Sequence, residues 1–72
     1  MNALKSVRFL RDISQASLAK KVDLDPAIIS RLENDLCRDT PAVIRWKERI
    51  CKTLKMPLEM IFPGTKKPEN DR

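Results

Sequence analysis

Histidine is absent from this chain of 72 residues, and its two cysteines, Cys37 and Cys51, are not arranged as a CxxC pair. A zinc site needs about four nitrogen or sulfur ligands, so we expect no metal and no cofactor in a single chain. The sequence also lacks a GxSxG motif, a glycine-rich phosphate loop and paired carboxylates beside an apolar wall. These absences argue against an enzyme.

Long apolar runs are missing as well. No stretch approaches the roughly 18 apolar residues of a membrane span, and the N-terminus lacks the apolar core typical of a signal peptide. We therefore expect a cytoplasmic protein with reduced thiols and no membrane partner. The single glycine and the scarcity of β-branched runs argue against an all-β fold.

Hydrophobic residues make up 42% of the chain, which is enough for one small core. We predict one domain over residues 1–63 and a flexible polar tail over residues 64–72, which has no apolar anchor. A core of this size supplies only a small free energy of unfolding, so oligomerisation is expected. The net charge of +5 favours nucleic acid as a partner, although many small proteins are basic for solubility alone.

Apolar spacing and capping signals predict short helices over residues 3–11, 15–22, 26–33, 41–54 and 57–62. In the first of these, Leu4, Val7 and Leu10 form the expected buried stripe. Asp12 follows at a position where helices commonly turn left-handed. Three helices begin with a polar cap, and two of them have a proline in the first turn. These residues are Ser14, Asp25 and Thr40 for the caps, and Pro26 and Pro41 for the prolines.

The helices at 15–22 and 26–33 are separated by a tight turn, which is typical of a helix-turn-helix. The motif needs a small residue where the helices touch, here Ala19, and a residue tolerant of left-handed backbone at the corner, here Asp23. Apolar residues must lock the two helices together, and they are Leu18, Val22, Ile29 and Leu32. A generic three-helix bundle could share part of this pattern.

The stretch SQASLAKKVDLDPAIISRLEN resembles the Cro/phage-repressor family of helix-turn-helix proteins, also called the Xre family. The ending LKMPLEMIF is similar to the last helix of that family. The resemblance extends over residues 3–62. Its hallmarks are Ser14-Gln15, Leu18-Ala19-Lys20-Lys21, the cap Asp25 and the run from Ile29 to Asn34.

The resemblance implies an all-α, five-helix, lambda-repressor-like domain that binds a palindromic operator on double-stranded DNA as a homodimer, most often as a repressor. It implies that Gln15 contacts a DNA phosphate at the start of its helix, where anions are favoured. It also implies that Asn34 and the loop after it contact the backbone on the other side. Arg8 matches an arginine of the family that pairs with the glutamate found here as Glu33.

Three aspartates, Asp12, Asp23 and Asp35, occupy places where members of the family often have glycine. The turns remain feasible, but Asp35 adds negative charge near the expected phosphate path. The segment after Glu33 is also longer than is usual in the family, and it contains Arg38 as a further candidate DNA contact.

The helix that starts at Pro26 is expected to enter the major groove. Arg31 is the best candidate for reading a base, because arginine can bond to both O6 and N7 of guanine. Its alternative role is a solvated or phosphate-bound arginine. Ala27 can pack on a thymine methyl group, Ser30 is a further polar contact, and Ile28 is expected to be an exposed apolar neighbour. Pro26 has no N–H to donate, so shape and backbone contacts are expected to contribute to specificity.

The predicted dimer surface lies on the last two helices, near Trp46, Met60, Ile61 and Phe62. Core packing is the alternative for Trp46, which lies one turn before Ile50. For the whole chain, two rival functions remain open. One is an antitoxin-like protein that binds a protein partner as well as DNA, and the other is a protein-interaction module with weak or no specific DNA binding.

Overall fold

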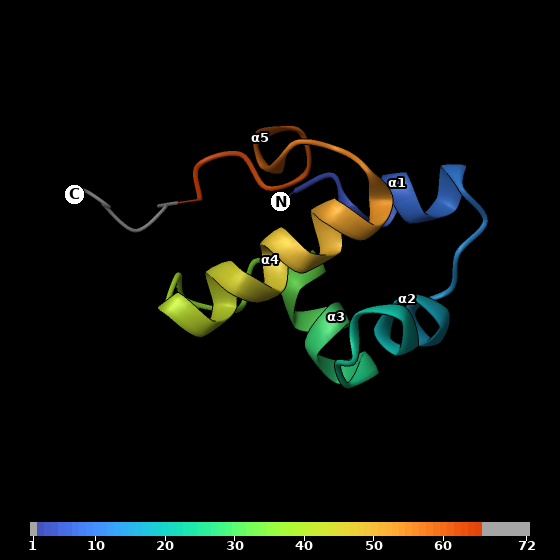
Figure 1. Cartoon of the computed structure of the whole chain (residues 1–72), viewed down its shortest axis with the longest axis horizontal. Coiled ribbons are helices and arrows are strands. Elements are labelled where there is room, and N and C mark those ends of the chain that lie inside the picture. The colour runs from blue at the N-terminus through green and yellow to red at the C-terminus, as the bar shows by residue number, and fades with distance from the viewer. Residues whose placement is uncertain (1, 66–72) are drawn as a thin grey trace.

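The computed structural model describes residues 2–65, which contain five α-helices and no strand. In chain order these helices are α1 (Leu4–Leu10), α2 (Gln15–Val22), α3 (Pro26–Glu33), α4 (Pro41–Leu54) and α5 (Leu58–Ile61) (Figure 1). The expected all-α class is confirmed for these residues, and none of their helices is long and apolar enough to cross a membrane. α1 and α5 are shorter than predicted, and the predicted polar tail lies outside the described residues from residue 66 onward.

The predicted N-caps of α2, α3 and α4 are all formed. In each case a side-chain oxygen of the capping residue accepts a backbone N–H of the first turn, and such a cap is worth about 1 kcal/mol. The pairs are Ser14 with Ser17 at 3.0 Å, Asp25 with Ala27 at 2.8 Å and Thr40 with Val43 at 3.2 Å.

Left-handed backbone follows four of the helices. It occurs directly after α2 and α4, at Asp23 (φ 59°) and Lys55 (φ 58°), and one residue further past α1 and α3, at Asp12 (φ 57°) and Asp35 (φ 56°). At the ends of α2 and α4, the next residue donates its N–H back into the helix, Leu24 to Ala19 at 2.9 Å and Met56 to Cys51 at 3.0 Å. Leu24 and Met56 both pack against the core. This apolar contact holds the turn in place, which explains why even Lys55 adopts a conformation that is unfavourable for it.

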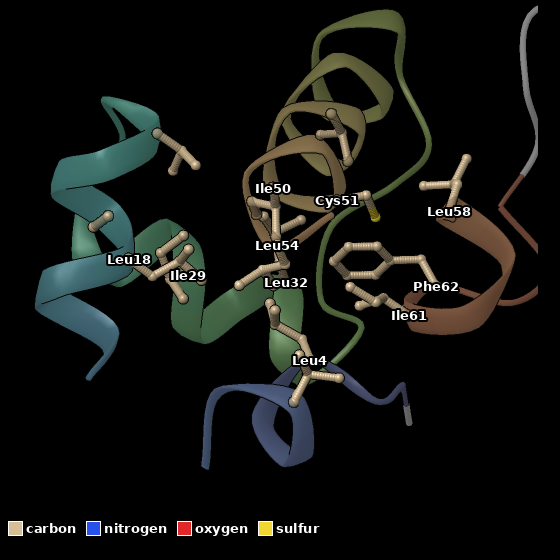
Figure 2. Close-up of a cluster of buried hydrophobic side chains, with 14 residues drawn as sticks. Leu4, Leu18, Ile29, Leu32, Ile50, Cys51, Leu54, Leu58, Ile61 and Phe62 are labelled. Carbon is tan, nitrogen blue, oxygen red and sulfur yellow. The ribbon is translucent and has the colours of Figure 1, made fainter. Parts of the chain in front are cut away.

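All five helices contribute to one hydrophobic core (Figure 2). Leu18 and Ile29 join α2 to α3, while Leu32, Ile50 and Leu54 fill the centre. The largest side chains with almost no exposed surface are Phe62, Leu4, Leu18, Ile29, Leu32, Ile50, Leu54, Ile61 and Val22. α2 and α3 are therefore fixed against the rest of the domain from the inside.

The prediction that Leu10 belongs to the buried stripe of α1 is wrong, because this side chain is 87% exposed. The inward face carries Leu4, Val7 and Arg8, and a helix rotates by about 100° per residue. The next position on that face is therefore Arg11 rather than Leu10. Arg11 follows the end of α1 and donates from Nη1 to the carbonyl of Leu54.

Ile61 and Phe62 are core residues and not part of a dimer surface, since they are 0% and 2% exposed. α5 is a single turn, and such a short helix is held mainly by burying its apolar side chains. Of the predicted dimer residues, Met60 is 59% exposed and Trp46 is half-buried against the core. Only these two remain available for a contact between copies.

Candidate nucleic-acid interface

Three residues, Asp23, Leu24 and Asp25, connect α2 to α3. Ala19 is 1% exposed and belongs to the core that joins the two helices, as expected for a small residue at a close helix contact. The turn at Asp23 and the cap at Asp25 fix where α2 ends and where α3 begins. The pair therefore has a defined geometry, set by short-range bonds and by the core beneath it.

The outer face of α3 carries Pro26, Ala27 and Arg31, and all three are exposed. Ser30 is half-buried on the same helix. Ile28, expected to be an exposed neighbour, is half-buried and packs against the core. The face that α3 presents to solvent is thus smaller than predicted. The groups on it that can contact a base are the guanidinium of Arg31 and the methyl group of Ala27.

A buried ion pair joins the first and third helices. Arg8 donates from Nε to Oε2 of Glu33, and the two side chains are 7% and 4% exposed. Arg8 also donates from Nη1 to the carbonyl of Ile13 at 2.8 Å, which ties down the segment between α1 and α2. Removing either partner would leave the other as a buried, uncompensated charge.

Gln15 joins the same network from the start of α2. Its Nε2 donates to Oε1 of Glu33 at 2.9 Å, so each carboxylate oxygen of Glu33 accepts a bond from a different helix. This bond orients the side chain proposed to contact a phosphate. Glu33 thus fixes α1 and the start of α2 to the end of α3.

Three side-chain hydrogen bonds hold the end of α3 and the start of the loop after it. Asn34 donates from Nδ2 to the carbonyl of Ser30 at 2.9 Å. Asn2 donates from Nδ2 to the carbonyl of Leu32 at 2.7 Å and to Oδ1 of Asp35 at 2.8 Å. These contacts of Asn2, with residues 30 or more positions away, were not predicted from the sequence. They hold the end of α3 against the N-terminal segment.

A buried lysine that the sequence did not single out anchors the rest of this loop. Lys47 on α4 is 8% exposed, and its Nζ lies 2.8 Å from Oδ1 of Asp39 and 3.3 Å from the hydroxyl of Thr65. The same ammonium lies 5.2 Å from the centre of the Phe62 ring. Arg38, next to Asp39, is exposed. The loop that carries this candidate phosphate contact is therefore attached to α4.

The part of the chain that the structure describes has no cluster of three or more potential metal ligands, at the cysteines or elsewhere. Cys37 is half-buried and Cys51 is buried. Burial, with a smaller effect of Glu48, raises the pKa of the Cys51 thiol to about 11. The reactive thiolate form of Cys51 is therefore rare near neutral pH.

We expect an aromatic disulfide reagent at pH 8 to modify Cys37 quickly and Cys51 on the order of 100-fold more slowly, as measured by thiolate release. In denaturant, both thiols should react in a single fast phase. Cys37→Ser should remove the fast phase and leave the slow one. Two equal, fast phases in the folded protein would contradict the burial of Cys51.

In comparisons with known proteins, no family model, no curated protein and no solved structure matches the chain.

Proposed function

We propose that this chain is a cytoplasmic, sequence-specific DNA-binding regulator in which α2 and α3 form a helix-turn-helix. The observation that carries the proposal is the outer face of α3, where Arg31 and Ala27 are exposed on a short helix whose opposite face is locked into the core. A helix presented in this way has the dimensions to enter the major groove. The resemblance to the Xre family supports the same assignment.

In this arrangement Arg31 reads guanine through O6 and N7, and Ala27 packs on a thymine methyl group. Gln15 reaches a phosphate from the start of α2, oriented by its bond to Glu33. Asn34 and Arg38 approach the backbone from the other side of α3. The contacts to phosphate set the register of the protein on DNA, and Arg31 supplies most of the direct base reading.

The net charge of +5 supports binding to a polyanion. Each phosphate neutralised by lysine or arginine releases counterions, so affinity should fall steeply as salt is raised. We propose a homodimer on a palindromic operator, with half-sites about one helical turn, roughly 34 Å, apart. Trp46 and Met60 are the predicted contact residues that remain exposed or partly exposed for such a dimer.

Selection from a random pool of duplex DNA near physiological salt tests the proposal. Sequencing of the bound fraction should show a palindromic motif whose half-sites are one turn apart. Binding without any enriched motif would contradict sequence-specific recognition, and absence of binding by the folded protein would contradict the proposal as a whole.

Arg31→Ala is expected to weaken binding to the selected site by about 1–3 kcal/mol and to relax the preference at one base position. The measurement is a titration of labelled duplexes that carry each base at that position. Lys5→Ala, which removes the same charge from α1, serves as the control and should leave the base preference unchanged. An equal loss on every duplex would instead make Arg31 a phosphate contact.

A second candidate function is an antitoxin-like or purely protein-binding role. It is favoured by the small reading face of α3, where Pro26 donates no hydrogen bond and Ile28 is half-buried. Asp35 adds negative charge near the expected phosphate path, which weakens attraction to DNA at that point. The selection experiment separates the purely protein-binding role, which predicts no enriched motif, from the proposed regulator. An antitoxin-like protein would also bind DNA, and it would differ from the regulator by its protein partner.

A further inference from the structure

The outer face of α1 carries two large apolar side chains in contact with solvent. Phe9 is 72% exposed and Leu10 is 87% exposed. One turn earlier, the same face has the exposed Lys5 and Ser6. Because Leu4, Val7 and Arg8 occupy the inward face, Phe9 and Leu10 cannot reach the core without turning the helix over.

A groove lies beside Phe9 and Leu10. It runs from Phe9 on α1 to Ala16 on α2, and Ile13 forms part of its wall. Ile13 is half-buried and packs against the core, so the apolar surface continues from the exposed pair into the domain. An exposed apolar patch bordered by polar residues often marks an interaction site.

The charges around this surface are mainly positive. Arg11 follows Leu10 and bonds to the carbonyl of Leu54, so its guanidinium lies at the end of α4, next to the exposed Lys55. Lys5 lies one turn before Phe9 on the same face of α1. Asp12 is the one acidic side chain that lines the groove. A segment that carries acidic residues beside apolar ones is therefore complementary to the surface.

A second copy of the chain fits this surface less well. A two-fold dimer centred on Phe9 and Leu10 would bring two sets of the same cations together, which is unfavourable. A stable interface buries about 800 Å² on each partner, whereas two such side chains supply on the order of 300 Å². The area is better matched to a short segment than to a globular partner.

An anionic membrane also fits less well. Interfacial helices present an apolar face along their whole length, and α1 has only its last turn to offer. Phe9 and Leu10 belong to α1, whereas the proposed base contacts Ala27 and Arg31 belong to α3. The adjoining groove shares Gln15 with the proposed phosphate contacts.

We propose that the α1 surface, defined by Phe9, Leu10 and the adjoining groove, binds an acidic amphipathic segment of a partner protein. The segment places its apolar side chains on Phe9 and Leu10 and its carboxylates near Lys5, Arg11 and Lys55. Recognition of an amphipathic helix in a shallow groove is a common way to bind peptides. The proposal does not depend on DNA binding by α3.

The test is a nuclear magnetic resonance titration of the full chain with a synthetic amphipathic peptide that has leucine on one face and glutamate on the other. Backbone shifts should concentrate in residues 5–16 and near Lys55. The double variant Phe9→Ser/Leu10→Ser should bind the peptide at least about 10-fold more weakly, given the apolar area removed. Leu36→Ser removes another apolar side chain that is 69% exposed, and it should leave binding unchanged.

A second peptide, with lysine in place of glutamate, should bind at least about 10-fold more weakly than the acidic one. Thermal unfolding of the double variant checks that it is folded, as expected for substitutions at exposed positions. The proposal is overturned if the acidic peptide does not bind, or if the shifts lie away from α1. It is also overturned if the pair instead drives self-association or binding to vesicles of anionic lipid.

Discussion

Glu33→Ala is expected to lower the free energy of unfolding by about 3–5 kcal/mol, because it leaves the Arg8 guanidinium buried without a counter-charge. The substitution also removes the acceptor of the Gln15 side chain, so α1 and α2 both lose their bonds to the end of α3. A core of this size supplies about 3–5 kcal/mol in total. Much of the variant should therefore be unfolded at room temperature, as measured by circular dichroism during urea titration.

Two further variants test whether the effect of Glu33→Ala comes from the loss of the ion pair with Arg8. Glu59→Gln neutralises an exposed carboxylate on α5 and should change stability by less than about 0.5 kcal/mol. The double variant Arg8→Met/Glu33→Leu replaces the ion pair by apolar side chains and should recover most of the loss. A loss below about 1 kcal/mol for Glu33→Ala, or no recovery in the double variant, would mean that the pair does not join the helices as described.

Phe62→Ala is expected to cost about 3–5 kcal/mol, because it opens a cavity in the core. Phe62 is 2% exposed, and its ring also lies under the ammonium of Lys47. The same residue was predicted from the sequence to lie on a dimer surface. The two roles differ in how the stability loss depends on protein concentration. Loss of a core residue destabilises the monomer at every concentration, whereas loss of a dimer contact has an effect only where the dimer forms.

Thermal unfolding across a wide range of protein concentration measures this difference. Met60→Ala, two positions before Phe62 but 59% exposed, is the matched control and should stay within about 0.5 kcal/mol of the parent. If Phe62→Ala unfolds the protein completely, Phe62→Leu provides a milder change of about 1–2 kcal/mol. A destabilisation that disappears at low concentration would contradict the core assignment.

The predicted features that the structure contains are mostly local. Ser14, Asp25 and Thr40 cap helices through bonds to residues two or three positions away, so the signal lies within a few letters of sequence. The bounds of α2, α3 and α4 are as predicted for the same reason. The Arg8–Glu33 pair spans 25 positions, and it was expected only because the chain resembles the Xre family.

The features that were missed depend on which elements meet. Arg49 donates from Nη1 to the carbonyl of Val22 at 2.7 Å, across 27 positions, and places a cation at the C-terminus of α2. Nothing near Arg49 in the sequence indicates this partner. In the helical pattern, Lys47 looks like an ordinary surface lysine. In the structure its ammonium contacts Asp39 of the loop, Thr65 and the Phe62 ring.

By itself, the sequence determined the all-α class, the capped starts of three helices and the left-handed turns at aspartate, because these follow from contacts within one helical turn. The tertiary structure decided which faces of the short helices are buried. It exposed Leu10, buried Ile61 and Phe62, and left Phe9 without an internal partner. The physical reason is that helices of one or two turns carry too few residues for their periodicity to select a face, so packing against the other helices selects it.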